Sequence, residues 1–151
     1  MWRAEPEEAA DVADLLIEFR DWWGRAAPSA ESFLASVERL MAAPDAEFLL
    51  GASGDGAPAG VCQLRFRFSV WHAAEDCWLE DLFVCEGARR SGLGAALVEA
   101  ALDRARERGC ARVELDVNEE NRAALALYEA FGFSAAPAPG GGRTLLMRRR
   151  L

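Results

Sequence analysis

A strand, a glycine-rich loop, a helix and a second strand follow one another in the middle of this chain, and they constrain its fold most. The run WLEDLFV (78–84) predicts a strand, and the loop ARRSGLGA (88–95) comes shortly after it. A helix is predicted from Gly92 to Arg108, with Gly109 at the position that favours glycine after a helix end. The alternating run RVELDVN (112–118) predicts the second strand. A crossover of this length indicates that the two strands are parallel neighbours.

The other segments predict helices first, then antiparallel strands, and one strand at the end. We expect helices over 6–22, from PSAES (28–32) to Pro44, and over 121–131, and strands over 47–52, 61–68 and 143–149. Apolar and polar residues alternate in 61–68, so this strand should bury one face, and GASGDGAP (51–58) is typical of a hairpin turn. The order predicts an α+β fold whose mixed sheet is antiparallel in its N-terminal part and is flanked by helices. We expect a single domain over 1–151, without a linker or a repeat.

The composition argues against several classes of site. A formal net charge of -8 disfavours a nucleic-acid-binding surface, and the absence of Lys excludes a Schiff-base or P-loop lysine. Cys62, Cys77, Cys85 and Cys110 form no C-x-x-C pair and His72 is the only histidine, so we expect no metal site. Cys85 is either a reactive thiol or a small apolar filler. Neither an apolar run of membrane-spanning length nor a signal peptide is evident, so we expect no membrane contact and a cytoplasmic location.

The loop 88–95 has the features of an anion-binding site. The first amides of a helix lack internal partners and carry the positive end of the helix dipole. Gly92 and Gly94 remove side-chain bulk, and Arg89 and Arg90 add positive charge. A Walker loop needs a lysine, and a dinucleotide-binding loop needs a third glycine, where this chain has Leu97. A simple turn before a helix is the alternative interpretation of the glycines.

A later segment helps to decide whether the loop 88–95 is a simple turn or an anion-binding site. NEENRAALALYEAFGF (118–133) places Asn121, Ala124, Tyr128, Gly132 and Phe133 at a spacing that, with R-x-x-G-x-G upstream, closely resembles the GNAT superfamily of acetyl-CoA-dependent N-acetyltransferases. The resemblance covers about residues 77–133. The strand WLEDLFV is similar in particular to the spermidine/spermine acetyltransferase branch of that superfamily.

The resemblance implies a GNAT fold, in which the parallel pair of strands is splayed at the cofactor site, and acetyl-CoA as cosubstrate without a metal. It places the coenzyme diphosphate on the loop from Arg89 to Ala95, and the pantetheine arm on the amides of Leu82, Phe83 and Val84. It implies that Tyr128 is the general acid. The full set of implied cofactor contacts is Leu82, Phe83, Val84, Arg89, Arg90, Ser91, Gly92, Leu93, Gly94, Ala95, Asn121, Arg122 and Ala124. A homodimer is common among the relatives.

Transfer to an amine needs a base, because an alkylamine with a pKa near 10 is protonated at neutral pH. Glu80 is the first candidate, since it precedes the cofactor-binding amides, and Asp81 on the opposite face is the second. The base can act through water. The alternative is that these carboxylates face solvent or form ion pairs with Arg65 or Arg67. An N–H of the strand, at Leu82 or Phe83, is expected to stabilise the oxyanion.

The acceptor is expected to be a small cationic amine such as a polyamine. Glu114 and Asp116 share a strand face, and with Glu80 and Asp81 they would attract a polycation if they edge the cleft. Trp22 and Trp23 are candidates for cation–π contact with the amine, although a core or dimer-interface role is the interpretation that we favour. An aminoglycoside, an amino acid or a protein N-terminus remains an alternative acceptor. A non-catalytic acyl-CoA sensor and a purely structural domain are the alternative classes, and His72 is expected at the surface.

Overall fold

Five strands form one sheet in the order β1-β2-β3-β4-β5, in which β1 to β4 are antiparallel neighbours and β5 runs parallel to β4. The structure is a computed structural model and describes residues 1–151 apart from 53, 55, 137–139, 143–144 and 150–151. Its elements are β1 (Trp2–Arg3), the 3-10 helix η1 (Pro6–Glu8), α1 (Ala9–Trp22), α2 (Ala30–Met41), β2 (Ala46–Ala52), β3 (Pro58–Ser69), β4 (Ala74–Val84), the 3-10 helix η2 (Glu86–Ala88), α3 (Leu93–Glu107), β5 (Arg112–Glu114) and α4 (Arg122–Ala130). The predicted α+β class and the parallel crossover are confirmed. No helix in the described ranges has the length and apolarity that a membrane span requires.

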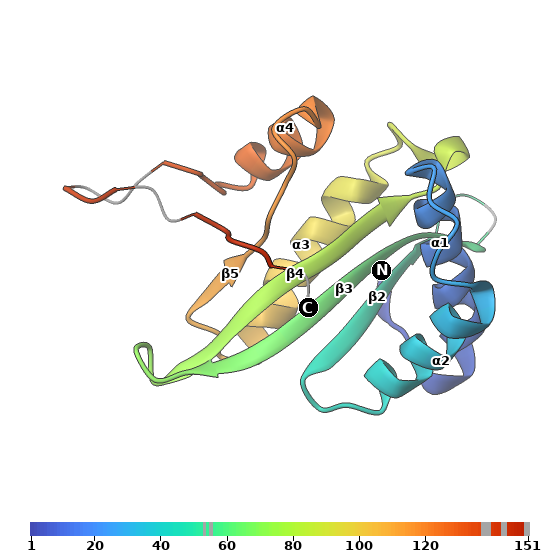
Figure 1. Cartoon of the computed structure of the whole chain (residues 1–151), viewed down its shortest axis with the longest axis horizontal. Coiled ribbons are helices and arrows are strands. Elements are labelled where there is room, and N and C mark those ends of the chain that lie inside the picture. Colours follow the sequence, from blue (N-terminus) through green and yellow to red (C-terminus); the bar gives the residue numbers. More distant parts are fainter. Residues whose placement is uncertain (53, 55, 137–139, 143–144, 150–151) are drawn as a thin grey trace.

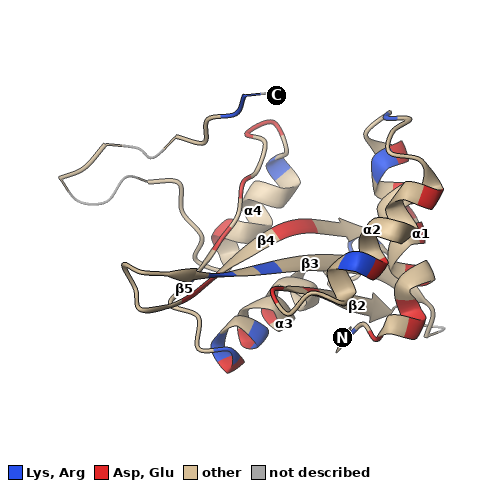
Figure 2. Ribbon diagram, turned by 60° about the horizontal axis from the view of Figure 1, so that its bottom comes forward, with Lys and Arg blue, Asp and Glu red and all other residues tan. Residues whose placement is uncertain are grey.

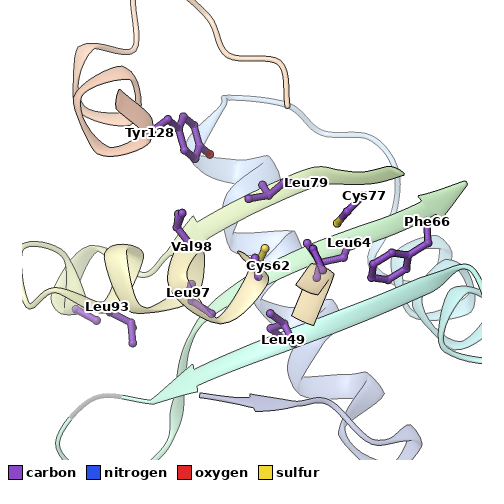
Figure 3. Close-up of a cluster of buried hydrophobic side chains, with 13 residues drawn as sticks. Leu49, Cys62, Leu64, Phe66, Cys77, Leu79, Leu93, Leu97, Val98 and Tyr128 are labelled. Atoms are coloured by element: carbon purple, nitrogen blue, oxygen red, sulfur yellow. The ribbon is translucent and has the colours of Figure 1, made fainter. Parts of the chain in front are cut away.

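The helices cover both faces of the sheet (Figure 1). On one face α1 and α2 pack against Phe48, Leu50 and Val61 of the sheet. On the other face lies α3, whose Leu97 and Val98 are fully buried in a second cluster with residues of β2, β3 and β4 (Figure 3). The apolar faces of α1, α2 and α3 are therefore buried against the sheet, as their helical periodicity predicts.

The strand β3 lies in the middle of this arrangement, and the prediction that it buries one face only is wrong. Val61 and Cys62 are both fully buried although they point to opposite faces, and Gln63 is buried too. Helices cover the sheet on both sides at this position, so the polar and the apolar face are both shielded. The alternation predicted for 61–68 holds only over Leu64–Arg67, where Phe66 is buried and Arg67 exposed, and it fails again at Phe68, which is exposed.

Two predicted strands differ from the structure. The strand predicted over 112–118 is regular only over Arg112–Glu114, and Asp116 follows it in an irregular segment. The strand predicted over 143–149 falls partly outside the described residues, and 145–149 form no strand in the structure. The run 112–118 carries an apolar alternation, but among the described residues its part beyond Glu114 has no neighbouring ladder.

A glycine sets how closely α3 approaches the sheet. A Cβ added to Gly60 would lie 3.0 Å from Leu97, 3.1 Å from the backbone oxygen of Phe83 and 3.2 Å from Leu93. Contacts of this length are tighter than side chains ordinarily accept, so residue 60 must lack a side chain for Leu93 and Leu97 to rest directly on β3. The first turn of α3, and the loop before it, are thereby held against β4.

Ion pairs fix the other end of α3. Arg104 donates to both carboxylate oxygens of the buried Glu47 at 2.6 and 2.8 Å, and Arg108 donates to it at 3.0 Å. Arg108 also donates to Glu75 of β4 and lies 3.9 Å from the centre of the Phe66 ring. These charge-assisted bonds tie the last turn of α3 to β2 and β4.

Candidate active site

The strands β4 and β5 separate at the centre of the molecule. The parallel ladder joins Asp76–Trp78 of β4 to Arg112–Glu114 of β5, whereas β4 continues to Val84. Beyond Trp78 the chain after β5 turns toward α4 (Figure 1), and β4 has no strand on that side among the described residues. This leaves an open strand edge over the residues that precede the glycine loop.

The register of β3 and β4 shows which backbone groups face this open edge. The N–H of Cys85 donates to the Ala59 carbonyl at 2.9 Å, and Phe83 stands opposite Val61 two residues earlier. Hydrogen-bonded and non-hydrogen-bonded pairs alternate in an antiparallel ladder, so the N–H and C=O of Phe83 point to β3. The same alternation directs those of Leu82 and Val84 outward. The predicted cofactor contact through the Phe83 amide is therefore corrected, and Leu82 and Val84 are the candidates that remain.

The loop before α3 presents unpaired amides. Arg90 and Gly92 adopt left-handed conformations, with φ of +61° and +90°, and Gly92 occupies the position before the first helical residue. The N–H of Leu93 is 3.4 Å from the Ser91 hydroxyl, and that of Ala96 donates to the Gly92 carbonyl. The amides of Gly94 and Ala95 belong to the first turn and lack intrahelical partners. This arrangement fits an anion such as a diphosphate.

The loop, the open edge and α4 meet at Gly94. A Cβ added there would lie 3.6 Å from Leu127 of α4 and 3.9 Å from Val84 of β4. The residues predicted for one site are thus brought together by three elements. Asn121 has a structural role at this junction, because its side-chain oxygen caps α4 by accepting from the Ala124 N–H at 3.1 Å. Arg122, also predicted for the cofactor, is the first residue of α4.

Arg89 lies differently from the prediction. Its Nε donates to the Val84 carbonyl at 3.0 Å, one of the outward groups of the open edge. Its guanidinium carbon is 5.2 Å from the ring centre of Trp22 and 5.8 Å from that of Phe83. In this structure Arg89 therefore connects the loop to β4 and to the end of α1.

The two carboxylates on β4 have different surroundings. Glu80 is exposed, whereas Asp81 is half-buried and stands opposite Gln63. Burial, together with the nearby charges of Glu80 and Asp116, raises the pKa of Asp81 to about 6. Figure 2 shows the acidic stretch on β4. The alternative in which these carboxylates pair with Arg65 or Arg67 is wrong, because Arg65 pairs with Asp45 and Arg67 with Glu114.

Tyr128 projects from the last turn of α4 toward the sheet (Figure 3), and not from the helix start. Its side chain is largely buried and packs edge-on against Phe133, with ring centres 5.8 Å apart. Burial, with smaller contributions from Cys62 and Asp81, raises the pKa of Tyr128 to about 12. The phenol therefore keeps its proton at neutral pH.

The other predicted acceptor contacts are partly engaged elsewhere. Glu114 accepts from Arg67 at 2.8 Å, and Asp116 pairs with Arg148 at 2.7 Å. Trp22 and Trp23 are about half exposed. Both rings join a cluster with Phe19, which stacks on Phe83 at 5.1 Å between ring centres.

Cys85 and His72 are engaged in other contacts. The Cys85 thiol donates to Glu18 at 3.1 Å, and burial and this hydrogen bond raise its pKa to about 11, which disfavours the nucleophilic thiolate. His72 is exposed and bonds Asp76 at 2.8 Å, as expected for a surface residue. Among the described residues no group of His, Cys, Asp and Glu side chains has the arrangement of a metal site.

Three groups at the site are not predicted by the sequence: Gln63, Phe19 and the outward carbonyl of Val84. Gln63 is buried opposite Asp81, and Phe19 links β4 to the two tryptophans at the end of α1. A glutamine within an apolar strand is a signal that could draw attention to Gln63. The direction of the Val84 carbonyl depends on strand register, which local sequence does not contain.

Comparison with known proteins gives a consistent result. The model of the acetyltransferase (GNAT) family matches residues 11–133. The uncharacterized N-acetyltransferase YhfO of Bacillus subtilis (strain 168) is 33% identical over 134 residues, which cover 87% of this chain and 87% of YhfO. The aminoglycoside N(6')-acetyltransferase type 1 of Klebsiella aerogenes is 32% identical over 136 residues, 85% of this chain and 87% of that protein.

A solved structure shows the same similarity in three dimensions. A crystallised candidate acetyltransferase from Arthrobacter sp. FB24 superposes with a TM-score of 0.87 at 34% identity. The match covers 99% of this chain and 94% of that one. It extends over the sheet, the glycine loop and α4 alike.

Proposed function

Because this chain belongs to the acetyltransferase (GNAT) family, we propose that it transfers the acetyl group of acetyl-CoA to a primary amine of a small polycation, with a polyamine as the first candidate. N-acetyltransferase activity follows from the family and from relatives that span most of the chain. The proposal consists of the identity of the acceptor and the roles of the individual residues.

The observation that carries the choice of acceptor is the pair Glu80 and Asp81. Neither carboxylate pairs with an arginine among the described residues, and Asp116 is close enough to raise the pKa of Asp81 further. Like charges held together favour a cation between them. An acceptor with two or more amines would neutralise more than one of these carboxylates at once.

The coenzyme supplies an activated acetyl thioester, and the residues of this chain fit its chemistry. The open amides of the loop, together with the left-handed turn at Arg90 and Gly92, suit the diphosphate. The outward N–H and C=O groups of Leu82 and Val84 suit an extended arm that contains amides, in the manner of an added strand. Backbone groups supply donors or acceptors to both contacts, so the backbone conformation matters at this site.

In the proposed mechanism Asp81 receives the proton that the ammonium must lose. A pKa of about 6 leaves Asp81 ionised at neutral pH and still basic enough to hold the proton briefly. Glu80, which is exposed, binds the cationic part of the acceptor. Tyr128 keeps its proton and donates it to the leaving thiolate. The outward N–H of Leu82 is the candidate donor to the oxyanion.

An aminoglycoside is the second candidate acceptor, because the Klebsiella aerogenes relative named above carries that activity in its name. Thialysine N-epsilon-acetyltransferase of Bos taurus, 31% identical over 53% of this chain and 49% of that protein, favours a small diamine-like acceptor instead. All of these acceptors present a primary amine on a cationic molecule.

The test is a thiol-release assay with acetyl-CoA and matched amines. Spermidine, kanamycin, lysine, an N-terminal alanine peptide and butylamine are compared at pH 7.5. We expect spermidine to give a kcat/KM about threefold to fivefold above butylamine, because its additional ammonium can pair with the exposed Glu80, and an exposed ion pair contributes up to about 1 kcal/mol. Preference for kanamycin would select the second candidate. Binding of coenzyme A without turnover would indicate a sensor, and no binding would indicate a structural domain.

A further inference from the structure

Arg89 is the residue whose contacts the proposed function leaves unexplained. We propose, on the basis of the proposed function, that Arg89 is a positioning residue which leaves Val84 and Trp22 when the coenzyme binds, and thereby frees the Trp22 ring for the acceptor. Three features of Arg89 support this movement: where its guanidinium lies, what it competes with, and what it covers.

The guanidinium lies across the open edge of β4. It donates to the Val84 carbonyl at 3.0 Å and packs on Trp22 and Phe83 at 5.2 and 5.8 Å. The Val84 carbonyl is one of the outward groups at the end of β4 that face the opening. An extended ligand that pairs with this edge needs the same groups. Arg89 and such a ligand therefore compete for one acceptor.

An anion on the loop would attract Arg89 away from this position. Arg89 directly precedes the turn formed by Arg90, Ser91 and Gly92, whose open amides and left-handed conformations suit a diphosphate. Without a ligand the guanidinium donates to a neutral carbonyl. A phosphate carries the charge opposite to the guanidinium and can accept two parallel hydrogen bonds from it, so a phosphate is a better acceptor than a single neutral carbonyl. The extended arm of the coenzyme would compete with Arg89 for the Val84 carbonyl, and the diphosphate would attract the guanidinium. Both effects favour the departure of Arg89 from Val84.

The movement would uncover an aromatic surface. Trp22 is 53% exposed, and Arg89 is the cation that packs on its ring. Once Arg89 has left, the ring is available to an amine cation. The acceptor would then bind better to the coenzyme complex than to the free protein, and the coupling would hold in both directions.

The chain offers a matched control. Arg25 packs on the neighbouring ring of Trp23 at 4.8 Å. It lies in the connection between α1 and α2, far from the glycine loop in the sequence. Arg25→Gln removes a cation from the same aromatic cluster without removing a contact to β4, whereas Arg89→Gln removes both.

The experiment follows the indole N–H signal of Trp22 in nitrogen–proton NMR spectra of the full chain during titration with coenzyme A. Trp22→Phe identifies the signal, and the amide signals of Gly92 and Gly94 report binding at the loop. In the wild type we expect the Trp22 signal to shift together with these amides. In Arg89→Gln it should already be displaced without ligand and should move by less than about a third as much. Arg25→Gln should behave as the wild type.

Three outcomes would oppose the proposal in different ways. If the glycine amides shift and the Trp22 signal of the wild type does not, Arg89 stays in place and the proposal is wrong. If Trp22 shifts equally in Arg89→Gln, the ligand acts on the ring directly and the proposal is also wrong. If no amide of the loop responds to coenzyme A, the proposed function itself fails. If Arg89→Gln does not fold, Arg89→Ala takes its place in the same comparison.

Discussion

Asp81 stands opposite Gln63 in the ladder of β3 and β4, and the next pair along the strands is Leu79 with Leu64, so Glu80 has no partner on β3. A β-bulge of this kind changes the direction of the side chains on the bulged strand. Two consecutive carboxylates are thereby placed in different surroundings, one in solvent and one half-buried. This difference is the basis for assigning the base to Asp81 and acceptor binding to Glu80.

Asp81→Asn should lower kcat/KM by about 10²- to 10⁴-fold, the usual contribution of a general base. In the wild type, activity should fall as the pH decreases through about 6, because Asp81 becomes protonated and cannot accept a further proton. A pH profile of kcat/KM checks both points. Glu80→Gln is the control and should raise KM for the acceptor while the limb near pH 6 remains. If Glu80→Gln removed the limb near pH 6 and Asp81→Asn kept it, Glu80 would be the base.

The same substitution should stabilise the protein. The pKa of Asp81 rises from the ordinary 3.8 to about 6 on folding, so the folded state favours the neutral acid. The contribution of Asp81 to stability is therefore present below pH 3.8 and is lost as the pH rises through about 6. Asp81→Asn should melt at a higher temperature than the wild type at pH 8, with a smaller difference at pH 4. Thermal unfolding at both pH values tests the sign, and a lower melting temperature at pH 8 would contradict it.

Tyr128→Phe should lower kcat by about 10²-fold or more, because the phenol is the proposed proton donor. The ring contact with Phe133 at 5.8 Å between centres is retained in this variant, so the melting temperature should stay close to that of the wild type. Steady-state kinetics and a melting curve provide the two readouts. An unchanged kcat would remove Tyr128 from the chemistry and leave it a packing role.

Gly92→Ala should weaken both folding and coenzyme binding. Gly92 has φ of +90° with open space around its Cβ position, so the cost is conformational, roughly 1–2 kcal/mol. Gly94→Ala is the matched control for stability, because its Cβ would meet only ordinary contacts at 3.6 and 3.9 Å. Denaturant unfolding and calorimetric binding of coenzyme A distinguish the two variants. Equal stability of both would show that the left-handed turn is not needed.

Glu47→Ala should destabilise the protein by about 3 kcal/mol, since it leaves Arg104 and Arg108 without their buried partner. Burial raises the pKa of Glu47, but its hydrogen bonds from Arg104 and Arg108 outweigh this and hold the pKa below its usual 4.5. The contribution is therefore present above pH 4.5 and is lost as the pH falls below it. Glu107→Ala, which removes an exposed partner of Arg104, should cost no more than about 0.5 kcal/mol. Urea unfolding at pH 7 and pH 4 makes the comparison.

Local patterns are sufficient to predict the parallel pair and the loop between its strands. The apolar run 78–84, the glycines at 92 and 94 and the stop at Gly109 each act within a few residues, so the sequence reveals them directly. The bulge at Glu80 cannot be predicted this way, because it exists only relative to the register of β3. Without the bulge, the sequence favours Glu80 as the base, although the surroundings of Asp81 suit that role better.

Contacts between distant segments account for the other differences. The position of Arg89 against Trp22 joins residues 67 positions apart, and no spacing rule connects them. The alternation in β3 predicts that Gln63 faces solvent, but α1 and α2 cover that face of the sheet at this position. The charge pattern indicates the acidic character of the site, whereas the pairing of Glu114 with Arg67 depends on the fold.

Gly60 determines the distance between the turn before α3 and the outward backbone groups of β4, although Gly60 belongs to neither. Because α3 rests directly on β3 at this position, the anion-binding turn and the outward groups of Leu82 and Val84 stand at a fixed separation, and a single long ligand has to span it. A side chain at residue 60 would lift the helix and lengthen that span. The separation between these two groups of backbone donors and acceptors therefore depends on the absence of a Cβ at residue 60, beneath α3.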